Sequence, residues 1–221
     1  MHALFVHGMG RTPLSGRHML ACLRAEKIVT HTAAYAATFE RFDAIRDRLA
    51  LRIAHVAAQG DYVLIGHSLG GVLIRAALAT LSPDTRRPSR VFLLGSPVRH
   101  SSFAYRLRRN WVFRVLAGDC GQLLASSERM TAIGRLEVPT TSIVGTTGWK
   151  GGLNPFQGDL NDGIVSLTET HADWIDEEVR VPAVHTYLPS NRTVTALIIE
   201  RIAHAQDNAN SRSIAACLRD P

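Results

Sequence analysis

Cysteine, long apolar runs and nucleotide-binding glycine arrays are all scarce in this sequence. Its three cysteines, Cys22, Cys120 and Cys217, have no metal-ligand spacing and cannot all pair within the chain, a usage typical of a reducing compartment. No cluster of histidine, cysteine and carboxylate residues has metal-ligand spacing, and no glycine array matches a phosphate-binding or dinucleotide-binding fingerprint. We therefore expect ordinary thiols, no metal and no cofactor.

We also expect no targeting segment and no membrane-spanning segment in this sequence. The stretch from Met1 to Val6 resembles a strand entering a glycine turn, without the basic start, apolar core and cleavage site of a secretory signal. We expect no standard export and a cytoplasmic location. With 46% apolar and 20% charged residues among 221, the chain is predicted to form one soluble globular domain over residues 1–221.

Acidic residues are outnumbered, since 19 Asp and Glu face 25 Lys and Arg, for a net charge of +6 that comes mostly from arginine. Such a balance favours contact with anionic surfaces. No recognised nucleic-acid-binding module is present, so we expect no nucleic acid partner.

Strand-like and helix-like segments alternate along the chain, which predicts an α/β fold with a parallel sheet covered by helices on both faces. The expected strands are Ala3–Val6, Ile28–Ala33, Tyr62–Ile65, Arg90–Leu94, Thr140–Val144 and Val179–Tyr187. The expected helices are Leu14–Glu26, Thr38–Ala58, Gly70–Leu81 and Asn191–Ala205. Two longer connections, about 98–137 and 145–162, follow strand ends, where ligands bind in open α/β sheets. We expect the first to form a lid or cap.

The most informative motif is Gly66-His-Ser-Leu-Gly70, which lies between an apolar strand and an apolar helix. A serine in such a turn is presented at a helix N-terminus, where backbone N–H groups can stabilise a developing negative charge. The motif predicts that Ser68 is a nucleophile.

Four motifs in order resemble the α/β-hydrolase family, and in particular its small bacterial lipases and esterases. These motifs are Val6–Gly10, Gly66–Gly70, Asn161–Val165 and Val184–Asn191. The resemblance implies a minimal α/β-hydrolase fold with about six mostly parallel strands. It also implies a triad in the chain order Ser68, Asp162, His185.

The triad roles follow from chemical need. His185 would accept the proton of Ser68, and Asp162 would orient the imidazole and stabilise its charged form. Asp159 and Asp173 are alternative acids; Asp162 is preferred because a glycine turn and an apolar pair follow it. His171 is the rival base, but it lies in a charged stretch that is expected to be solvated.

An oxyanion intermediate needs two N–H donors. We expect one from Leu69, the residue after the nucleophile, and the resemblance implies a second from Met9. The neighbouring His7 and His67 are interpreted as structural or pocket-lining residues and are candidates for substrate binding.

Residues 99–114 contain five arginines, several aromatic residues and no acid. If helical, Phe103, Leu107, Trp111 and Val115 form one apolar stripe. The segment is expected to form a lid over the active site or a patch that touches anionic lipid. The alternative is a core-packed helix with exposed arginines. Trp111, and Trp149 in the glycine-rich segment 145–158, are candidate substrate-binding residues.

The sequence thus predicts a serine hydrolase that cleaves small-molecule or lipid carboxylic esters through an acyl-enzyme. Acyl transfer or thioester hydrolysis by the same triad remains open, because the acyl-enzyme does not specify what attacks it. A non-catalytic protein that binds a lipid or a partner is the alternative from another class.

Overall fold

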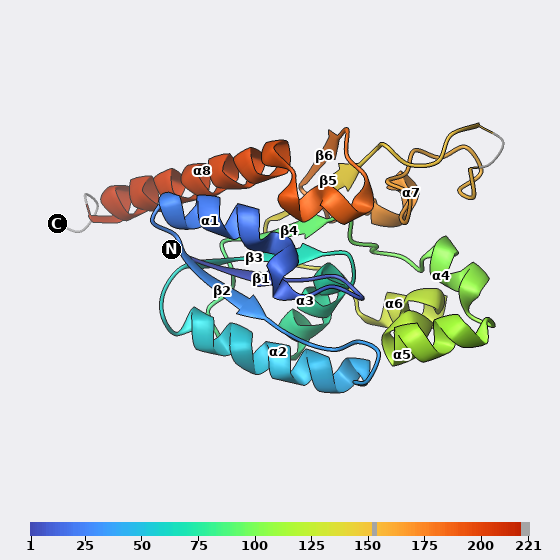
Figure 1. Ribbon diagram of the computed structural model, residues 1–221. Coiled ribbons are helices and arrows are strands. Elements are labelled where there is room, and N and C mark those ends of the chain that lie inside the picture. The colour runs from blue at the N-terminus through green and yellow to red at the C-terminus, as the bar shows by residue number, and fades with distance from the viewer. Residues whose placement is uncertain (152–153, 218–221) are drawn as a thin grey trace.

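A six-stranded, all-parallel sheet forms the centre of the protein (Figure 1). The computed structural model describes residues 1–151 and 154–217, and side chains as far as residue 206. The strand order is β2-β1-β3-β4-β5-β6. The strands are β1 (His2–Val6), β2 (Val29–Ala33), β3 (Tyr62–His67), β4 (Arg90–Leu94), β5 (Thr140–Gly145) and β6 (Glu177–Val181). The predicted parallel sheet of about six strands is confirmed.

Burial along the strands explains their composition. Every residue of β3 and β5 is buried, as expected for central strands of a parallel sheet that is covered on both faces. The edge strands β2 and β6 are only partly buried and carry polar residues such as Thr30 and Arg180.

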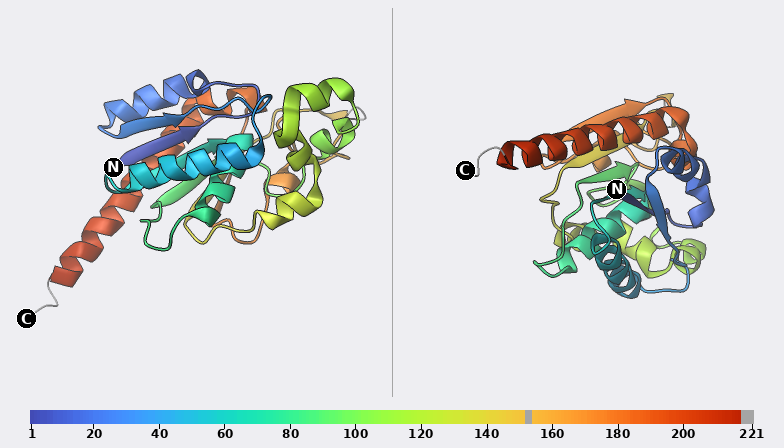
Figure 2. Two further views of the ribbon diagram at one scale, coloured as in Figure 1. Left: turned by 90° about the horizontal axis from the view of Figure 1, so that it is seen from below. Right: turned by 90° about the vertical axis from the view of Figure 1, so that its left-hand side faces the viewer.

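Two pairs of helices cover the sheet. Helices α2 (Phe42–Ala57) and α3 (Leu69–Thr80) pack on the face that includes Leu4 and Leu64. On the other face, α1 (Arg17–Ala25), which follows the 3-10 turn η1 (Pro13–Gly16), and α8 (Arg192–Cys217) pack on Phe5 and Ile65. Figure 2 shows the two layers on opposite sides of the strands. Because successive strand residues point to opposite faces, each strand contributes to both cores.

The connection over about 98–137 forms a helical segment beyond the carboxyl ends of the strands (Figure 1). It contains α4 (Ser102–Leu107), α5 (Trp111–Ala125) and α6 (Ser127–Ala132), each capped at its start by a serine or asparagine side chain. A contact between Thr38 Oγ1 and the Leu116 carbonyl, at 2.7 Å, ties α5 to the loop before α2. A further short helix, α7 (Leu167–Thr170), precedes β6.

Two predictions about local structure were wrong. The last strand ends at Val181 and does not reach Tyr187, because Pro182 lacks the N–H that a sheet ladder needs. A 3-10 helix, η3 (His185–Ser190), follows it. The continuous apolar stripe from Phe103 to Val115 is also absent, because Asn110 interrupts the helix and caps a new one.

Other predictions concern thiols, metals and membranes. Cys22 and Cys120 are free thiols, and burial raises the pKa of Cys120 to about 12, whereas the side chain of Cys217 lies outside the described residues. Gly152 and Leu153 of the glycine-rich segment lie outside them too. Among the described residues there is no group of three or more potential metal ligands. No helix in that part of the chain has the length and apolarity needed to cross a membrane.

Candidate active site

Ser68 occupies a strained turn between β3 and α3. Its backbone has φ of 52° and ψ of −122°, a conformation that side-chain-bearing residues rarely adopt. The turn is tight: a Cβ atom on Gly70 would collide with the carbonyl oxygens of Val6 and His7. The N–H of Ser68 donates to the Leu94 carbonyl at 2.9 Å, which holds the turn against the end of β4.

Asp162 and His185 form a buried hydrogen-bonded pair at the same edge of the sheet. Asp162 Oδ2 lies 2.6 Å from His185 Nδ1, and the two residues are 1% and 7% exposed. The other carboxylate oxygen, Oδ1, accepts hydrogen bonds from the N–H groups of Ile164 and Val165. The His185 N–H donates to the Asp162 carbonyl at 2.9 Å. Both members of the pair are therefore fixed in position.

Neighbouring residues bring the turn and this pair together. His67, next to Ser68, places Nε2 3.0 Å from the His185 carbonyl oxygen, and the two imidazole rings lie 4.8 Å apart. Gly95 follows Leu94, and a Cβ on Gly95 would lie 2.9 Å from Asp162 Oδ2. Within the described part of the chain, neither the Ser68 hydroxyl nor His185 Nε2 makes a hydrogen bond.

Two backbone donors flank the serine. In the described residues, the N–H groups of Met9 and Leu69 donate no hydrogen bond. Leu69 begins α3, so its N–H is one of the donors that a helix leaves free at its first turn. Gly8 packs on the serine turn, because a Cβ there would lie 3.1 Å from the Cβ of Ser68. Met9 follows Gly8 directly, so its loop lies beside Ser68.

Comparison with solved structures places this arrangement among known folds. At the level of sequence, no family model and no curated protein matches the chain. A Bacillus licheniformis lipase in mature form is 16% identical, with a TM-score of 0.69 over 90% of both chains. A thioesterase of the prodiginine pathway in Streptomyces coelicolor is 16% identical, with a TM-score of 0.64 over 90% of this chain and 88% of that chain. Tomato methylketone synthase I is 13% identical, with a TM-score of 0.62 over 92% and 98%.

The chain has the α/β-hydrolase fold. Within this fold, Ser68, the Asp162–His185 pair and the Met9 loop follow different strands that end at one edge of the sheet. This edge is where open α/β sheets bind ligands.

His7 and His67 are core residues of this α/β-hydrolase fold, 1% and 2% exposed. His7 stacks on Tyr35 with ring centroids 4.2 Å apart, and its Nδ1 lies 2.9 Å from the Gly8 carbonyl oxygen. Burial lowers the pKa of His7, and burial together with the neighbouring His185 lowers the pKa of His67 well below its ordinary value. Both imidazoles are therefore neutral at pH 7 and support the serine turn and the Met9 loop.

The alternative acids, Asp159 and Asp173, and the rival base, His171, lie outside the Asp162–His185 pair. Asp159 accepts a hydrogen bond from the Thr168 N–H at 3.0 Å. Partial burial acts to raise the pKa of Asp159, but hydrogen bonds from Thr168 and Ser166 outweigh it, so the pKa is lowered. His171 is exposed and faces Glu178 at 3.3 Å, and Asp173 is fully exposed. Asp162 is the aspartate whose carboxylate lies within hydrogen-bond distance of His185.

The two candidate tryptophans differ in their surroundings. Trp111 is 74% exposed at the start of α5. Trp149 is 50% exposed, and its indole Nε1 donates to the Gly163 carbonyl at 3.1 Å. Trp149 also lines an open cavity of about 340 Å³ beside Asp162 and His185.

Two buried residues that support the acid loop were not assigned a role from the sequence. Asn161 Oδ1 accepts from the N–H groups of Trp149 and Gly163, so this side chain joins the two halves of the loop. Glu169 accepts from the N–H groups of Ser102 and Ser166. The spacing Ser166-x-x-Glu169 is a capping box that is visible in the sequence, whereas its link to Ser102 depends on tertiary contacts.

Proposed function

We propose that this protein is a serine hydrolase that cleaves carboxylic esters through an acyl-enzyme intermediate. The observation that carries the proposal is the buried 2.6 Å hydrogen bond between His185 and Asp162. This pair lies at the carboxyl ends of the strands, where Ser68 occupies its strained turn. A buried carboxylate beside imidazole Nδ1 leaves Nε2 as the proton acceptor for a serine hydroxyl.

In the proposed reaction, the Ser68 hydroxyl turns toward His185 Nε2, gives up its proton and attacks the ester carbonyl. Asp162 accepts a hydrogen bond from Nδ1–H and stabilises the imidazolium that forms. The imidazolium then protonates the departing alcohol, which leaves the acyl group on Ser68. Water, deprotonated by the same histidine, attacks the acyl-enzyme and releases the acid.

The oxyanion that forms in each step would be bound by the N–H groups of Met9 and Leu69. Both groups lack a partner in the described part of the chain, so they can donate without breaking an existing hydrogen bond. Donors that are already oriented lower the barrier because little reorganisation is needed when charge develops.

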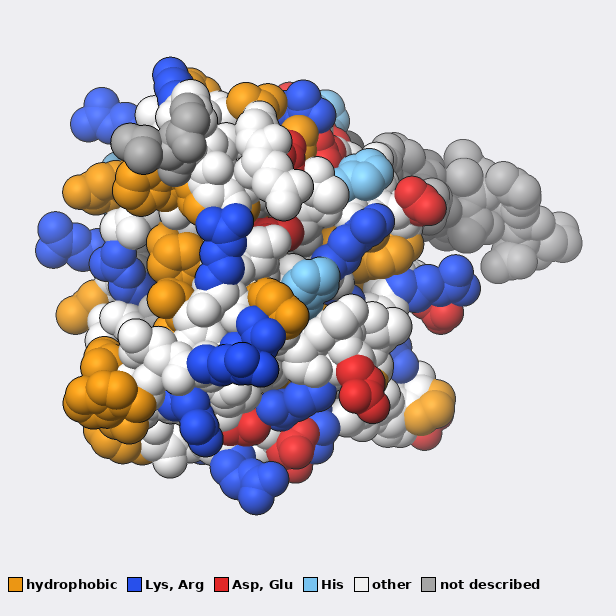
Figure 3. All heavy atoms as spheres, turned by 90° about the vertical axis from the view of Figure 1, so that its right-hand side faces the viewer, with side chains coloured by type: hydrophobic (Ala, Val, Ile, Leu, Met, Phe, Trp, Pro, Cys, Tyr) orange, Lys and Arg blue, Asp and Glu red, His pale blue; other side chains and the backbone are white. Residues whose placement is uncertain are grey.

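The choice of esters is supported by the lipase and thioesterase among the similar structures. The acyl-enzyme chemistry is the same for an ester and a thioester, so the leaving group is decided by experiment. A lipid ester is favoured by the exposed apolar and arginine side chains of α4 and α5. These helices lie beyond the strand ends that position Ser68 (Figure 1), and Figure 3 shows apolar and basic side chains together on that side of the molecule. We propose that this helical segment covers the site and contacts anionic lipid surfaces.

The test uses purified full-length protein and a series of p-nitrophenyl esters and acyl-thioesters of increasing chain length. We expect a burst of released alcohol and labelling of Ser68 by a fluorophosphonate. Ser68→Ala should lower kcat/KM by about 10⁵-fold or more while the melting temperature stays close to that of the parent. A folded Ser68→Ala variant that retains activity contradicts the role of Ser68 as nucleophile. A native protein that resists the fluorophosphonate and turns over none of the substrates also contradicts the proposal and favours a binding protein.

A further inference from the structure

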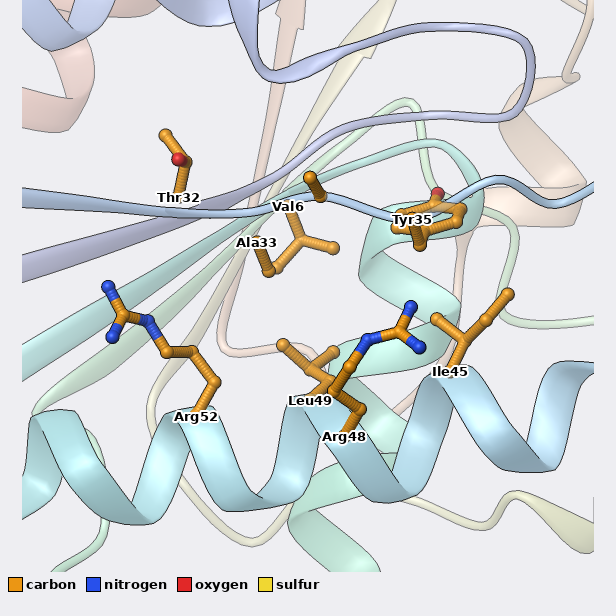
Figure 4. A pocket seen from close by; sticks show the side chains of 9 residues that line it. Val6, Thr32, Ala33, Tyr35, Ile45, Arg48, Leu49 and Arg52 are labelled. Atoms are coloured by element: carbon orange, nitrogen blue, oxygen red, sulfur yellow. The ribbon is translucent and has the colours of Figure 1, made fainter. Parts of the chain in front are cut away.

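A second cavity lies between the edge strand β2 and helix α2 (Figure 4). It has a volume of about 180 Å³, and Ser68 does not line it. Its floor is apolar, because Val6, Ile45 and Leu49 are buried there at 3% exposure or less. The strand side carries Ala33, whose small side chain leaves the space unfilled.

Two arginines of α2, one turn apart, flank this cavity. Figure 4 shows Arg48 and Arg52 extending from the helix toward the strand on either side of Leu49. Arg48 forms an ion pair with Glu40 at 2.6 Å. In the described residues, the half-buried Arg52 has no carboxylate within ion-pair distance. The positive charge of Arg52 is therefore uncompensated at the mouth of an apolar cavity.

Other groups near Arg52 are basic as well. Burial lowers the pKa of His31, and the neighbouring Arg52, His2 and His55 lower it further, so the fixed positive charge at this corner is that of Arg52. The acid beside the cavity, Glu40, is already paired with Arg48. An anion is attracted to such a site, and a cation is repelled.

The shape and charge of the site together define its ligand. A guanidinium group binds a carboxylate through two parallel hydrogen bonds, and an apolar floor favours an aliphatic chain. A volume of about 180 Å³ is that of roughly six water molecules, which restricts the chain to a few carbons. We propose that this cavity binds a short-chain aliphatic monocarboxylate, with its carboxylate on Arg52 and its chain on Leu49 and Ala33.

The proposal goes beyond the proposed function, because the site does not use Ser68. Tyr35 lines the cavity, and its hydroxyl donates to the His7 carbonyl at 2.6 Å while its ring stacks on His7. His7, Met9 and Ser68 do not line the cavity. Binding here should therefore be independent of the serine.

The test is calorimetric titration of the full chain with hexanoate, with hexanol and hexylamine as matched ligands of the same length. We expect hexanoate to bind at least about tenfold more tightly than hexanol and hexylamine not to bind. Arg52→Gln should weaken hexanoate binding about tenfold, and Ala33→Leu should abolish it by filling the cavity. Arg46→Gln, on the same helix outside the cavity, and Ser68→Ala should leave the affinity unchanged.

Several outcomes overturn the proposal. These are no binding of hexanoate at millimolar concentration, equal binding of hexanol, or full affinity in Arg52→Gln. Loss of hexanoate binding in Ser68→Ala would instead mean that hexanoate binds beside the serine, and this outcome also contradicts the second site. Because Arg52 makes no ion pair among the described residues, Arg52→Gln should fold even if Ala33→Leu does not.

Discussion

Asp162 is held on both of its carboxylate oxygens, one by backbone N–H groups and the other by His185. This arrangement distinguishes it from Asp159, whose carboxylate accepts the N–H of Thr168. The two aspartates lie in the same loop, so their side-chain partners, not their positions in the chain, separate their roles.

Asp162→Asn should therefore lower kcat for ester cleavage by about 10⁴-fold without unfolding the protein. The amide oxygen can still accept from Ile164 and Val165, which turns the NH₂ group toward His185 Nδ1 and imposes the wrong tautomer. Asp159→Asn is the matched control and should retain activity within about twofold. Steady-state kinetics and melting curves of both variants decide the assignment, and a larger loss in Asp159→Asn would reverse it.

Gly95 provides a second residue-scale prediction. Its φ is +53°, and an added Cβ would lie 2.8 Å from Leu188 and 3.1 Å from His185 Nδ1. Gly134 has φ of +77° with open space around it. Both alanine variants should lose about 1 kcal/mol of unfolding free energy to backbone strain. Gly95→Ala should lose more unfolding free energy than Gly134→Ala, and it should also lose activity. Urea denaturation measures the first effect and steady-state kinetics the second. Equal effects of the two substitutions would mean that crowding at Gly95 is unimportant.

At the scale of elements, α4 and α5 differ from the other helices in what they expose. Trp111, Val115 and Leu116 are each at least 60% exposed, and Arg106, Arg109 and Arg114 are exposed in the same segment. Arg108 stacks on Tyr105 at 3.4 Å. The alternative interpretation, a core-packed helix with exposed arginines, describes residues 117–125 of α5, which include the buried Cys120, Leu123 and Leu124. It does not describe the exposed first half of α5.

We predict that the protein co-sediments with phosphatidylserine vesicles and not with phosphatidylcholine vesicles, and that 1 M salt releases it by screening the arginines. Leu116→Ala should weaken vesicle binding. Leu51→Ala, which removes a leucine of similar exposure from α2, should not. Equal binding to both lipids, or equal effects of the two substitutions, would contradict a specific role for this segment.

At the scale of the whole molecule, burial of neutral histidines makes stability depend on pH. Burial lowers the pKa of His7, and lowers that of His67 well below its ordinary value of 6.5. Below about pH 6.5, the unfolded chain binds protons at these histidines that the folded chain does not. The free energy of unfolding should therefore fall with decreasing pH, by up to about 1.4 kcal/mol per pH unit for each histidine.

Urea denaturation at pH 5, 6, 7 and 8 measures this slope. His67→Gln should flatten it, because an amide N–H can replace the contact to the His185 carbonyl without titrating. His204→Gln removes an exposed histidine and should leave the slope unchanged. A parent protein whose stability is constant between pH 7 and pH 5 would mean that His67 and His7 are not buried as neutral groups.

The sequence by itself determined the features that depend on local chemistry. Apolar strands, helix-forming stretches and the glycine-flanked turn at Ser68 each follow from neighbouring residues, so the parallel sheet and the position of the serine could be predicted. Ser68, Asp162 and His185 lie at the same side of the sheet because each follows the carboxyl end of a parallel strand.

The tertiary structure decided what depends on contacts between distant segments. The order of the motifs predicted Asp162 and His185 as acid and base, but their contact across 23 residues, like that of Thr38 and Leu116 across 78, forms only in the folded chain. The cavity between β2 and α2 likewise depends on how a strand with small residues packs on a distant helix. Packing of this kind reflects the volumes of side chains from several segments at once, which a single stretch of sequence does not encode.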